Sequence, residues 1–406
     1  SLAAQALEIN ERSPGVNEVL GIIFQKQSKP NQAIECFQKE LDINPQATNS
    51  LLNLGLLLLQ RGQSDAAVKS LEKASALAPS EQCRLLLAQA YQSLGQFNKA
   101  IIELKKLDVA HSKNKMIPFN LGVCLLNTGH NIDAIEAFKI AIQIDDSFGA
   151  AWGNLGNAFQ AEGQHQEALA ATLKSLELNP DNPDALLNLG GIYKDLDQLN
   201  EALASTLKSL ELKPDNPTAY TNLGIIYKNL GQLNKALAST LKALELNPQN
   251  PTNHMNLGGI YKDLGQLDHA LTSTLKSLEL NPDNSDGHMN LGGIYKELGQ
   301  LDHALASTLK SLELKPDNPD GHMNLGQIYK ELGQLDNALA STLKSLKLKP
   351  ENPDAHLNLG IIYKDRGQLN QALASTLKSL ELKPNNPDAN LNLGGIYKDL
   401  GQLDQA

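Results

Sequence analysis

The chain has 406 residues, of which 41% are hydrophobic and only 4% aromatic. Its formal net charge is −10, with 45 acidic and 35 basic residues, and no long block of one sign interrupts the mixture. Because a nucleic-acid-binding protein needs the opposite field, we expect no nucleic-acid partner. The most apolar stretch, residues 51–59, is broken by Asn53 and Gly55 and is far shorter than the roughly 20 apolar residues that span a bilayer, so we expect no membrane segment.

Three cysteines, Cys36, Cys83 and Cys124, stand far apart without CxxC spacing. They predict neither a disulfide framework nor a thiolate metal site, and we expect them to be buried packing residues. The chain begins at Ser1 and stops at Ala406 within its own repeat pattern, so we expect it to be a segment of a longer protein. We expect the protein to be cytoplasmic.

A repeat of 34 residues runs through almost the whole sequence. Extending it towards the start gives Gly21 and Gly55, with Ala88 at the glycine position after a one-residue deletion near Pro79. A fixed period means that each unit packs only on its neighbours, which predicts an open solenoid rather than separate globular domains. The glycines that mark the repeat at 34-residue intervals are Gly122, Gly156, Gly190, Gly224, Gly258, Gly292, Gly326, Gly360 and Gly394.

The repeats fall into three stretches. Residues 1–13 are predicted to hold the remnant of a preceding repeat, centred on residues 2–8. Residues 14–182 hold diverged repeats, and residues 183–406 hold repeats that are nearly copies of one another, the last one truncated. About eleven full units and a truncated twelfth result.

Each unit encodes two helices. In the unit from Pro183 to Asn216, Leu186, Leu189 and Tyr193 fall on one buried helical face. Asn182 is placed to cap the first helix, followed by proline and an aspartate near the positive end of the helix dipole.

A glycine ends this helix in most units, for example Gly231, where a left-handed conformation is needed. In this unit Asp197 replaces the glycine at a modest cost. A second helix is predicted from Leu199 to Leu212, with Lys208 and Glu211 as a solvated pair on its outer surface.

This frame of glycine, tyrosine, alanine and proline resembles the tetratricopeptide repeat, W-x2-L-G-x2-Y, then A-x3-F, then P. Trp152, Gly156 and Phe159 match its first half, and Ala134 and Phe138 match its second. The resemblance covers essentially the whole chain and implies an all-α fold: a right-handed α-solenoid superhelix of about eleven and a half 34-residue helix-turn-helix repeats.

One position departs from the family pattern. From Thr172 onward threonine stands where the family has phenylalanine. We expect this change to tighten or shift the stacking of repeats, and each threonine hydroxyl to bond to a carbonyl one turn earlier. The later copies are Thr206, Thr240, Thr274, Thr308, Thr342 and Thr376.

Opposite the buried face, the first helix carries a recurring asparagine. In tetratricopeptide solenoids that face lines the concave groove, where amides can donate to and accept from an extended peptide backbone. The predicted peptide-binding ladder is Asn53, Asn120, Asn154, Asn188, Asn222, Asn256, Asn290, Asn324, Asn358 and Asn392. The alternative is that asparagine is simply a common polar residue of this groove, with no ligand.

The ladder resembles the arm of the O-linked N-acetylglucosamine transferases, and residues 151–156 are especially similar. That resemblance implies a groove that holds substrate peptide, and similar repeats precede bacterial sulfotransferase or methyltransferase domains. Three functions remain open. The chain is a scaffold that binds a protein or extended peptide, or the substrate-recruiting arm of a larger transferase whose catalytic domain lies outside this chain, or its uniform later repeats are a spacer that holds other domains apart. Apolar solenoid ends also predict self-association end to end.

Beside the ladder runs a line of lysines with acidic or amide neighbours such as Asp195 and Glu297. We expect a solvated, self-neutralising groove edge rather than a basic docking strip. These groove-edge residues are Lys194, Lys228, Lys262, Lys296, Lys330 and Lys364.

Four histidines, His254, His288, His322 and His356, recur once per repeat. That spacing is too wide for a shared zinc ion, and they occupy the place of Trp152, so we expect packing contacts and no metal. The abundant serines and threonines repeat identically in every unit and have no histidine and carboxylate beside them, whereas an active site is singular. We therefore predict no catalytic residue and no cofactor in this chain.

Overall fold

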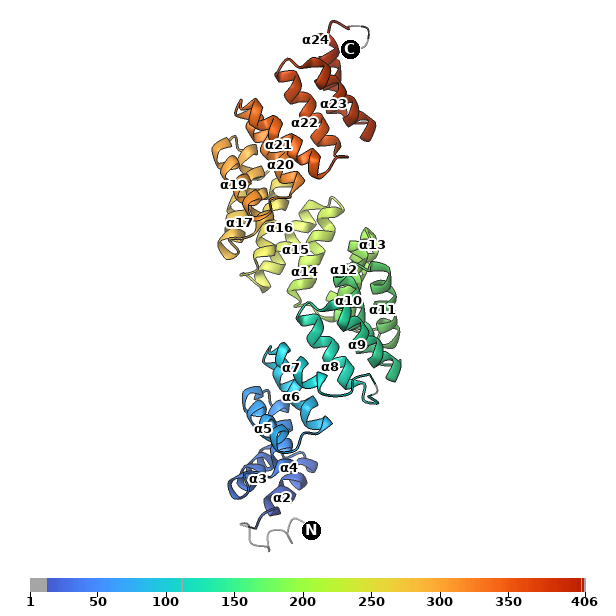
Figure 1. Cartoon of the computed structure of the whole chain (residues 1–406), viewed down its shortest axis with the longest axis vertical. Coiled ribbons are helices and arrows are strands. Elements are labelled where there is room, and N and C mark those ends of the chain that lie inside the picture. Colours follow the sequence, from blue (N-terminus) through green and yellow to red (C-terminus); the bar gives the residue numbers. More distant parts are fainter. Residues whose placement is uncertain (1–12, 111, 403, 405–406) are drawn as a thin grey trace. The chain divides into compact units, whose positions relative to one another are not determined.

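The computed structural model describes residues 13–110, 112–402 and 404. Within them every regular element is a helix and no strand occurs. The remnant of an earlier repeat predicted at residues 2–8 lies outside the described residues. The chain divides into two compact units, residues 1–212 and 213–406, coloured blue to green and yellow-green to red in Figure 1.

The helices alternate between a first helix, with an even number, and a second helix, with an odd number. The described part of unit 1 contains six pairs: α2 (Val16–Lys26), α3 (Pro30–Ile43), α4 (Thr48–Gln60), α5 (Ser64–Leu77), α6 (Glu81–Ser93), α7 (Phe97–Lys105), α8 (Met116–Asn127), α9 (Asn131–Ile144), α10 (Gly149–Ala161), α11 (His165–Leu178), α12 (Pro183–Asp195) and α13 (Leu199–Leu212).

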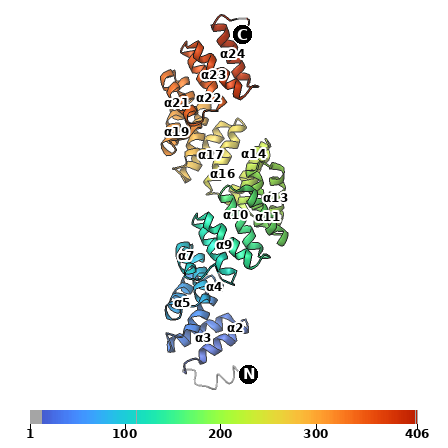
Figure 2. The ribbon, with the colours of Figure 1, turned by 45° about the vertical axis from the view of Figure 1, so that its right-hand side comes forward.

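The described part of unit 2 contains five pairs and one further first helix: α14 (Pro217–Asn229), α15 (Leu233–Leu246), α16 (Pro251–Asp263), α17 (Leu267–Leu280), α18 (Ser285–Glu297), α19 (Leu301–Leu314), α20 (Pro319–Glu331), α21 (Leu335–Leu348), α22 (Pro353–Asp365), α23 (Leu369–Leu382) and α24 (Pro387–Asp399). Each first helix runs beside its second helix, as α22 and α23 show in both views (Figures 1 and 2). The predicted count of eleven and a half repeats is confirmed for the described residues, as is the all-α solenoid fold.

The predicted capping residues set the ends of the first helices. Asn182 Oδ1 accepts hydrogen bonds from the backbone N–H groups of Asp184 and Ala185, at 3.1 and 3.2 Å. These bonds satisfy two of the four N–H groups that a helix leaves unpaired at its start. The asparagines that cap the later first helices are Asn216, Asn250, Asn284, Asn318, Asn352 and Asn386.

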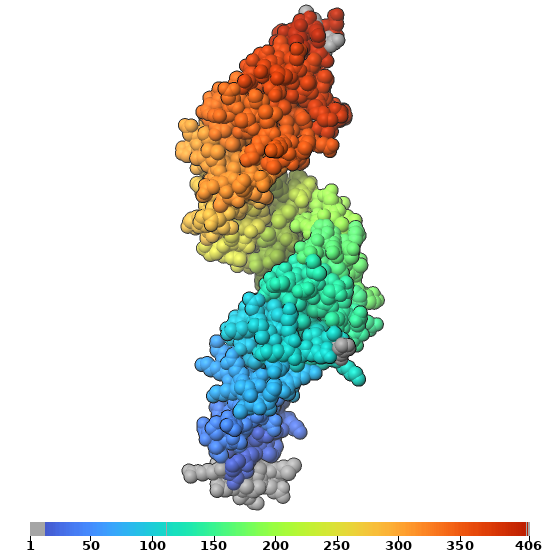
Figure 3. Space-filling view, in the orientation of Figure 1, coloured from blue at the N-terminus to red at the C-terminus, as the bar shows by residue number. Residues whose placement is uncertain are grey.

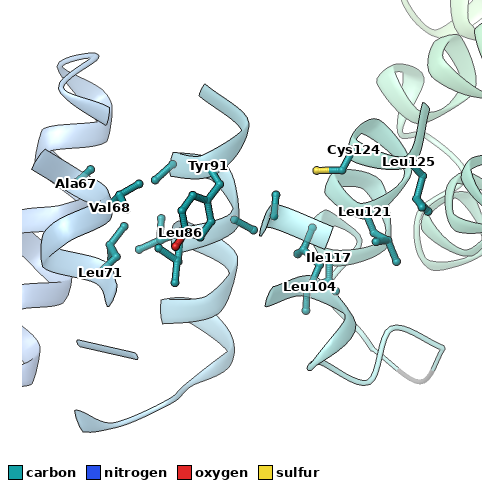
Figure 4. Close-up of a cluster of buried hydrophobic side chains, with 14 of the residues drawn as sticks. Ala67, Val68, Leu71, Leu86, Tyr91, Leu104, Ile117, Leu121, Cys124 and Leu125 are labelled. Carbon is teal, nitrogen blue, oxygen red and sulfur yellow. The ribbon is translucent and has the colours of Figure 1, made fainter. Parts of the chain in front are cut away.

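In unit 1 apolar side chains form a core that continues from one helix pair to the next. Leu71 of α5 faces Leu86 and Tyr91 of α6, and Ile117 and Leu121 of α8 extend the same cluster (Figure 4). All five side chains are buried or nearly so. Because each pair buries its apolar face on its neighbours, no pair has a closed core of its own.

The two helices of a pair meet at the glycine of the first helix that recurs once in each repeat. A Cβ added at Gly190 would lie 3.2 Å from the carbonyl oxygen of Ala202 on the facing helix and against the hydroxyl of Thr206. In the earlier pairs the glycine faces a larger side chain, such as the ring of Phe138 opposite Gly122. In the threonine-containing pairs the glycine faces a hydroxyl instead, such as that of Thr240 opposite Gly224. The expected effect of this change on the stacking of repeats stays a prediction.

Serines of the second helix add a hydrogen bond to this contact. Ser209 Oγ donates to the Pro183 carbonyl at 2.7 Å, and Ser277 Oγ donates to the Pro251 carbonyl at 2.8 Å. Each bond joins the end of a second helix to the start of its first helix. The expected hydroxyl bond to the preceding turn occurs at Thr206, whose Oγ1 donates to the Ala202 carbonyl at 2.8 Å.

At four other positions the threonine hydroxyl does not bond to a carbonyl one turn earlier, so the prediction was wrong there. In each of them the buried hydroxyl has no hydrogen-bond partner, although it lies against the first-helix glycine as the hydroxyl of Thr206 does. The four residues are Thr172, Thr274, Thr308 and Thr342.

The four periodic histidines pack on the turn before their helix. His322 Nε2 lies 2.9 Å from the Pro316 carbonyl oxygen, and the other three make the same contact. Trp152 Nε1 donates to the Asp146 carbonyl at 2.8 Å from the equivalent position. Since a carbonyl can only accept a hydrogen bond, each histidine carries its proton on Nε2. Histidine can therefore replace tryptophan here, because both rings donate one N–H to the same carbonyl.

Asp197 and Ser28 are the described residues other than glycine that have a positive φ, which is +59° at Asp197 and +70° at the equivalent Gly231. Left-handed backbone strains residues that have a Cβ, so we expect Asp197→Gly to raise the free energy of unfolding by up to about 1 kcal/mol. The measurement is urea unfolding of the whole chain. Gly231→Asp is the matched control and should lower stability, and the same sign for both changes would contradict the explanation.

Acidification should destabilise the packing around His322. Burial lowers the pKa of His322 below its ordinary value of 6.5, with the Lys344 charge acting the same way and the Pro316 bond and Asp317 opposing. The unfolded chain therefore binds a proton first, so the contribution of the neutral ring is present above pH 6.5 and is lost as the pH falls through the folded pKa.

Urea unfolding of the wild type and of His322→Tyr measures this effect. It is carried out at several pH values between about 7.5 and 5, the range in which histidine titrates. Tyrosine occupies the same position at Tyr220. The loss of stability on acidification should be smaller in the variant. Equal losses in both proteins would contradict the assignment to His322.

Candidate functional site

A hollow beside the predicted ladder lies on the first helices of unit 2. It has a volume of about 640 Å³ and is formed by α20, α22 and α24. Its walls combine apolar side chains with amides, two aspartates and one lysine. The lining residues are Met323, Gln327, Asp354, Leu357, Asn358, Ile361, Lys364, Asp388, Leu391 and Asn392.

Two of the predicted ladder residues, Asn358 and Asn392, therefore lie together in this hollow. Asn188, Asn222, Asn256, Asn290 and Asn324 are half-buried at the equivalent place on α12, α14, α16, α18 and α20, and Asn53 is half-buried on α4. The unit 1 residues Asn120 and Asn154 bond their Nδ2 atoms to carbonyls of their own helix, at 2.7 and 2.9 Å. Peptide binding by the ladder stays a prediction.

At one position a ladder amide is hydrogen-bonded to the threonine of the preceding repeat. Asn392 Nδ2 donates to Thr376 Oγ1 at 2.9 Å. One repeat earlier, Asn358 Nδ2 and Thr342 Oγ1 occupy the equivalent places, and both atoms are buried without a hydrogen-bond partner. In both asparagines the nitrogen is on the protein side, which leaves the carbonyl oxygen as the group available to a ligand.

Sequence reasoning missed this coupling. The signal was a constant separation of 16 residues between each threonine and the next ladder asparagine, as between Thr376 and Asn392. The threonine that departs from the family pattern thus supports the asparagine that forms the predicted site.

The lysines at the groove edge are neutralised mainly across repeats. Lys228 Nζ lies 3.2 Å from Asp263 Oδ2, and Lys262 Nζ lies 3.2 Å from Glu297 Oε1. Lys364 Nζ is 3.7 Å from Asp399 Oδ2 in the same arrangement. The edge therefore carries pairs of opposite charge rather than a basic strip.

The other three groove-edge lysines have different surroundings. Lys194 Nζ contacts Asp195 of its own helix at 3.1 Å, and Lys296 Nζ donates to Gln327 Oε1 at 2.6 Å. Lys330 is half-buried on α20.

Where a first helix has two adjacent glycines, as at 258–259 and 292–293, the second glycine makes room for one of these lysines. A Cβ at Gly259 would lie 2.9 Å from Lys228 Nζ, and one at Gly293 would lie 3.4 Å from Lys262 Nζ. These glycine pairs are therefore packing contacts inside helices.

The side chains that line the hollow are suited to noncovalent binding. The hollow provides amide and carboxylate acceptors beside apolar walls, a combination that fixes the orientation of a bound chain. Among the described residues no group of three histidine, cysteine, aspartate or glutamate side chains could hold a metal ion. None of the described helices is both long enough and apolar enough to pass through a bilayer.

Family models match most of the chain. Models described as TPR repeat match residues 190–231, 292–333, 326–365 and 361–401. Models described as tetratricopeptide repeat match residues 149–182, 217–250, 171–204, 274–306 and 252–284. A model of subunit 3 of the anaphase-promoting complex, or cyclosome, matches residues 26–107.

The curated relatives are distant and longer. The probable UDP-N-acetylglucosamine–peptide N-acetylglucosaminyltransferase SPINDLY of Hordeum vulgare is 27% identical over 136 residues, which is 34% of this chain and 12% of that protein. The BBSome complex member BBS4 of Bos taurus is 29% identical over 124 residues, 30% of this chain and 24% of that protein. The matched segments thus span less than a quarter of these relatives.

Solved structures agree on the fold. The hetero-tetramer Cut9-Hcn1 of the anaphase-promoting complex aligns with a TM-score of 0.53 and 17% identity, over 97% of this chain and 98% of that one. The human IFIT1 dimer with PPP-AAAA aligns with a TM-score of 0.52 and 20% identity, over 88% and 87% of the two chains. With the repeat frame, the helix pairs and the matched models in agreement, this chain belongs to the tetratricopeptide repeat family.

Proposed function

We propose that this tetratricopeptide scaffold binds a protein partner by holding an extended peptide segment along the first helices of unit 2. The observation that carries the proposal is the hollow on α20, α22 and α24, in which Asn358 and Asn392 lie beside apolar walls. It is open over three successive repeats, as a peptide requires.

The amides favour recognition of the peptide main chain. Asn392 Nδ2 is already bonded to Thr376, so its Oδ1 is left to accept a backbone N–H of a ligand. Because the same residue recurs at every repeat, such contacts tolerate many side-chain sequences. Apolar contacts with Leu357, Ile361 and Leu391 would then add affinity that depends on the ligand side chains.

Charge argues for a protein ligand rather than nucleic acid. The net charge is −10, and the groove-edge lysines Lys228, Lys262 and Lys364 are each paired with a carboxylate. Asp354 and Asp388 line the hollow itself. A phosphate backbone would be repelled here. We expect the complex to form in the cytoplasm.

Selection from a displayed library of random, unstructured peptides against the purified chain tests the proposal. Selected peptides should lose about tenfold or more in affinity for the variant Asn324→Ala, Asn358→Ala, Asn392→Ala, because each lost hydrogen bond is worth about 1 kcal/mol. A peptide with the same side chains but alternate backbone nitrogens methylated should also lose affinity for the wild type.

The matched control replaces three exposed asparagines of second helices, Asn200, Asn234 and Asn370, by alanine and should bind like the wild type. Circular dichroism confirms that both triple variants are folded. If the two variants bind equally, or if methylation of the backbone has no effect, the ladder does not hold the main chain.

A second candidate role is recruitment of protein substrates to a transferase, which the match to the barley protein favours. In a polypeptide that joins this chain to a transferase domain, replacing Asn154, Asn188 and Asn222 by alanine should lower turnover of long protein substrates and spare short peptides. Equal effects on both substrates would exclude the arm role and leave the scaffold.

A further inference from the structure

One position of the groove departs from the repetition of unit 2. It lies three residues after the ladder asparagine, on the same face of the first helix. The residue there is glycine in α16, α18 and α24, glutamine in α20 and isoleucine in α22: Gly259, Gly293, Gly395, Gln327 and Ile361. The hollow is formed by α20, α22 and α24, which belong to the orange to red part of the surface in Figure 3.

Where this position is glycine, a lysine of the preceding repeat crosses it. Lys228 Nζ lies 2.9 Å from the place of a Cβ at Gly259, and it pairs with Asp263 at 3.2 Å. The same crossing occurs at α18 and α24. In α20, Lys296 Nζ donates instead to Gln327 Oε1 at 2.6 Å. These four helices therefore place charged or polar atoms at this position of the groove.

Ile361 gives α22 an apolar surface at the same position. Its half-buried side chain lines the hollow together with Met323 of α20 and Leu357 of its own helix. Among the described residues Lys330 of the preceding repeat makes no ion pair, whereas the equivalent lysines that cross a glycine do. The isoleucine side chain occupies the space that glycine leaves open to a lysine. Met323, Leu357 and Ile361 thus form an aliphatic seat in the hollow.

Ile225 is the equivalent isoleucine of α14, but the rest of the seat is missing there. Thr221 stands in the place of Leu357, and Thr218 stands in the place of Asp354. Of the first helices of unit 2, only α22 therefore combines isoleucine at this position with an apolar residue just before the ladder asparagine.

The charge of the hollow indicates a second feature of the ligand. Asp354 and Asp388 line the hollow and are exposed, and neither makes an ion pair with a described residue. Lys364, the lysine of the hollow, lies 3.7 Å from Asp399 Oδ2 and is neutralised by it. The hollow thus has an excess of negative charge, which favours a basic side chain on the ligand and disfavours an acidic one.

We propose that Ile361 sets the register in which the groove holds an extended peptide, because an aliphatic side chain of the peptide packs on the aliphatic seat. A basic residue two positions away lies on the same side of the extended chain and faces Asp354 or Asp388. This inference rests on the proposed function. The asparagine ladder alone sets no register, since a peptide shifted by one repeat makes the same hydrogen bonds. Burial of an aliphatic side chain at one repeat favours that register by about tenfold.

Parallel selections from a displayed library of random, unstructured peptides, against the whole chain and against Ile361→Gly, test the proposal. The fold tolerates glycine at this position, since α16, α18 and α24 have it. Peptides selected by the wild type should share one aliphatic residue with lysine or arginine two positions away. They should bind Ile361→Gly about tenfold more weakly, whereas the matched control Ile225→Gly should bind them like the wild type.

Photo-crosslinking of a selected peptide locates the register. With a photoreactive leucine analogue at the aliphatic position, the peptide should cross-link to α22 in the wild type and to several first helices in Ile361→Gly. Gly293→Ile creates a second seat, because Met289 and Met255 stand in the places of Leu357 and Met323. That variant should therefore gain a second cross-linked site in α18.

A double variant tests the charge of the hollow. Asp354→Asn with Asp388→Asn should lower the affinity for the selected peptide by about threefold, as expected for solvated ion pairs. The affinity for the same peptide with alanine in place of its basic residue should not change. Equal losses for both peptides would overturn the assignment of a basic residue to the ligand.

The outcomes also distinguish this inference from the proposed function. If no peptide is selected, or if selected peptides bind the Asn324→Ala, Asn358→Ala, Asn392→Ala variant like the wild type, peptide binding by the ladder fails and the register fails with it. If binding depends on those asparagines but Ile361→Gly changes neither the affinity nor the cross-linked helix, the register alone is overturned. Wild-type selections without a shared aliphatic residue would overturn it as well.

Discussion

The structure depends on how closely the two helices of a pair approach each other at one small residue of the first helix, which is glycine in every described first helix except α6, where it is Ala88. At Gly292 a Cβ would lie 3.3 Å from the Ala304 carbonyl oxygen of the second helix, so only a residue without a side chain allows the backbones to meet this way. The second helix must then present alanine, serine and threonine to the contact. Those requirements fix its rotation, and its rotation decides which side chains face the solvent and which face the next repeat.

The departure from the family pattern connects this packing to the candidate site. Threonine in place of phenylalanine puts a small side chain with a hydroxyl against the first-helix glycine, and at Thr376 that hydroxyl accepts a hydrogen bond from Asn392 of the following repeat. The amide nitrogen is then used within the protein and the oxygen is left for a ligand. The same residue thus shapes the helix pair and sets the orientation of the group proposed to bind peptide.

Much of the fold could be predicted from the sequence because its determinants are local. The second helix at Leu199–Leu212 and the cap at Asn182 follow from spacing and from backbone donors that only certain residues satisfy. The positive φ of Asp197 follows from the glycine that replaces it in other repeats. Such features depend on a few adjacent residues, and the repeat confirms each one several times.

Features that depend on contacts between repeats could not be predicted in the same way. A sequence does not state which way an amide points, so the bond from Asn392 to Thr376 and the unpaired Nδ2 of Asn358 needed coordinates. The ion pairs between Lys228 and Asp263 join residues of different repeats. A leucine in a helix is ordinarily assigned to the core, so the sequence does not separate the exposed Leu309 from the buried Leu312, whereas the structure does.

Amide hydrogen exchange of the chain with and without a selected extended peptide tests the groove most directly, because it locates the ligand without changing any residue. Binding along the ladder predicts slower exchange in the first helices α20, α22 and α24 and no change in the second helices α19, α21 and α23. Protection concentrated in the second helices, or spread evenly over both units, would contradict the proposal that the asparagine groove is the binding site.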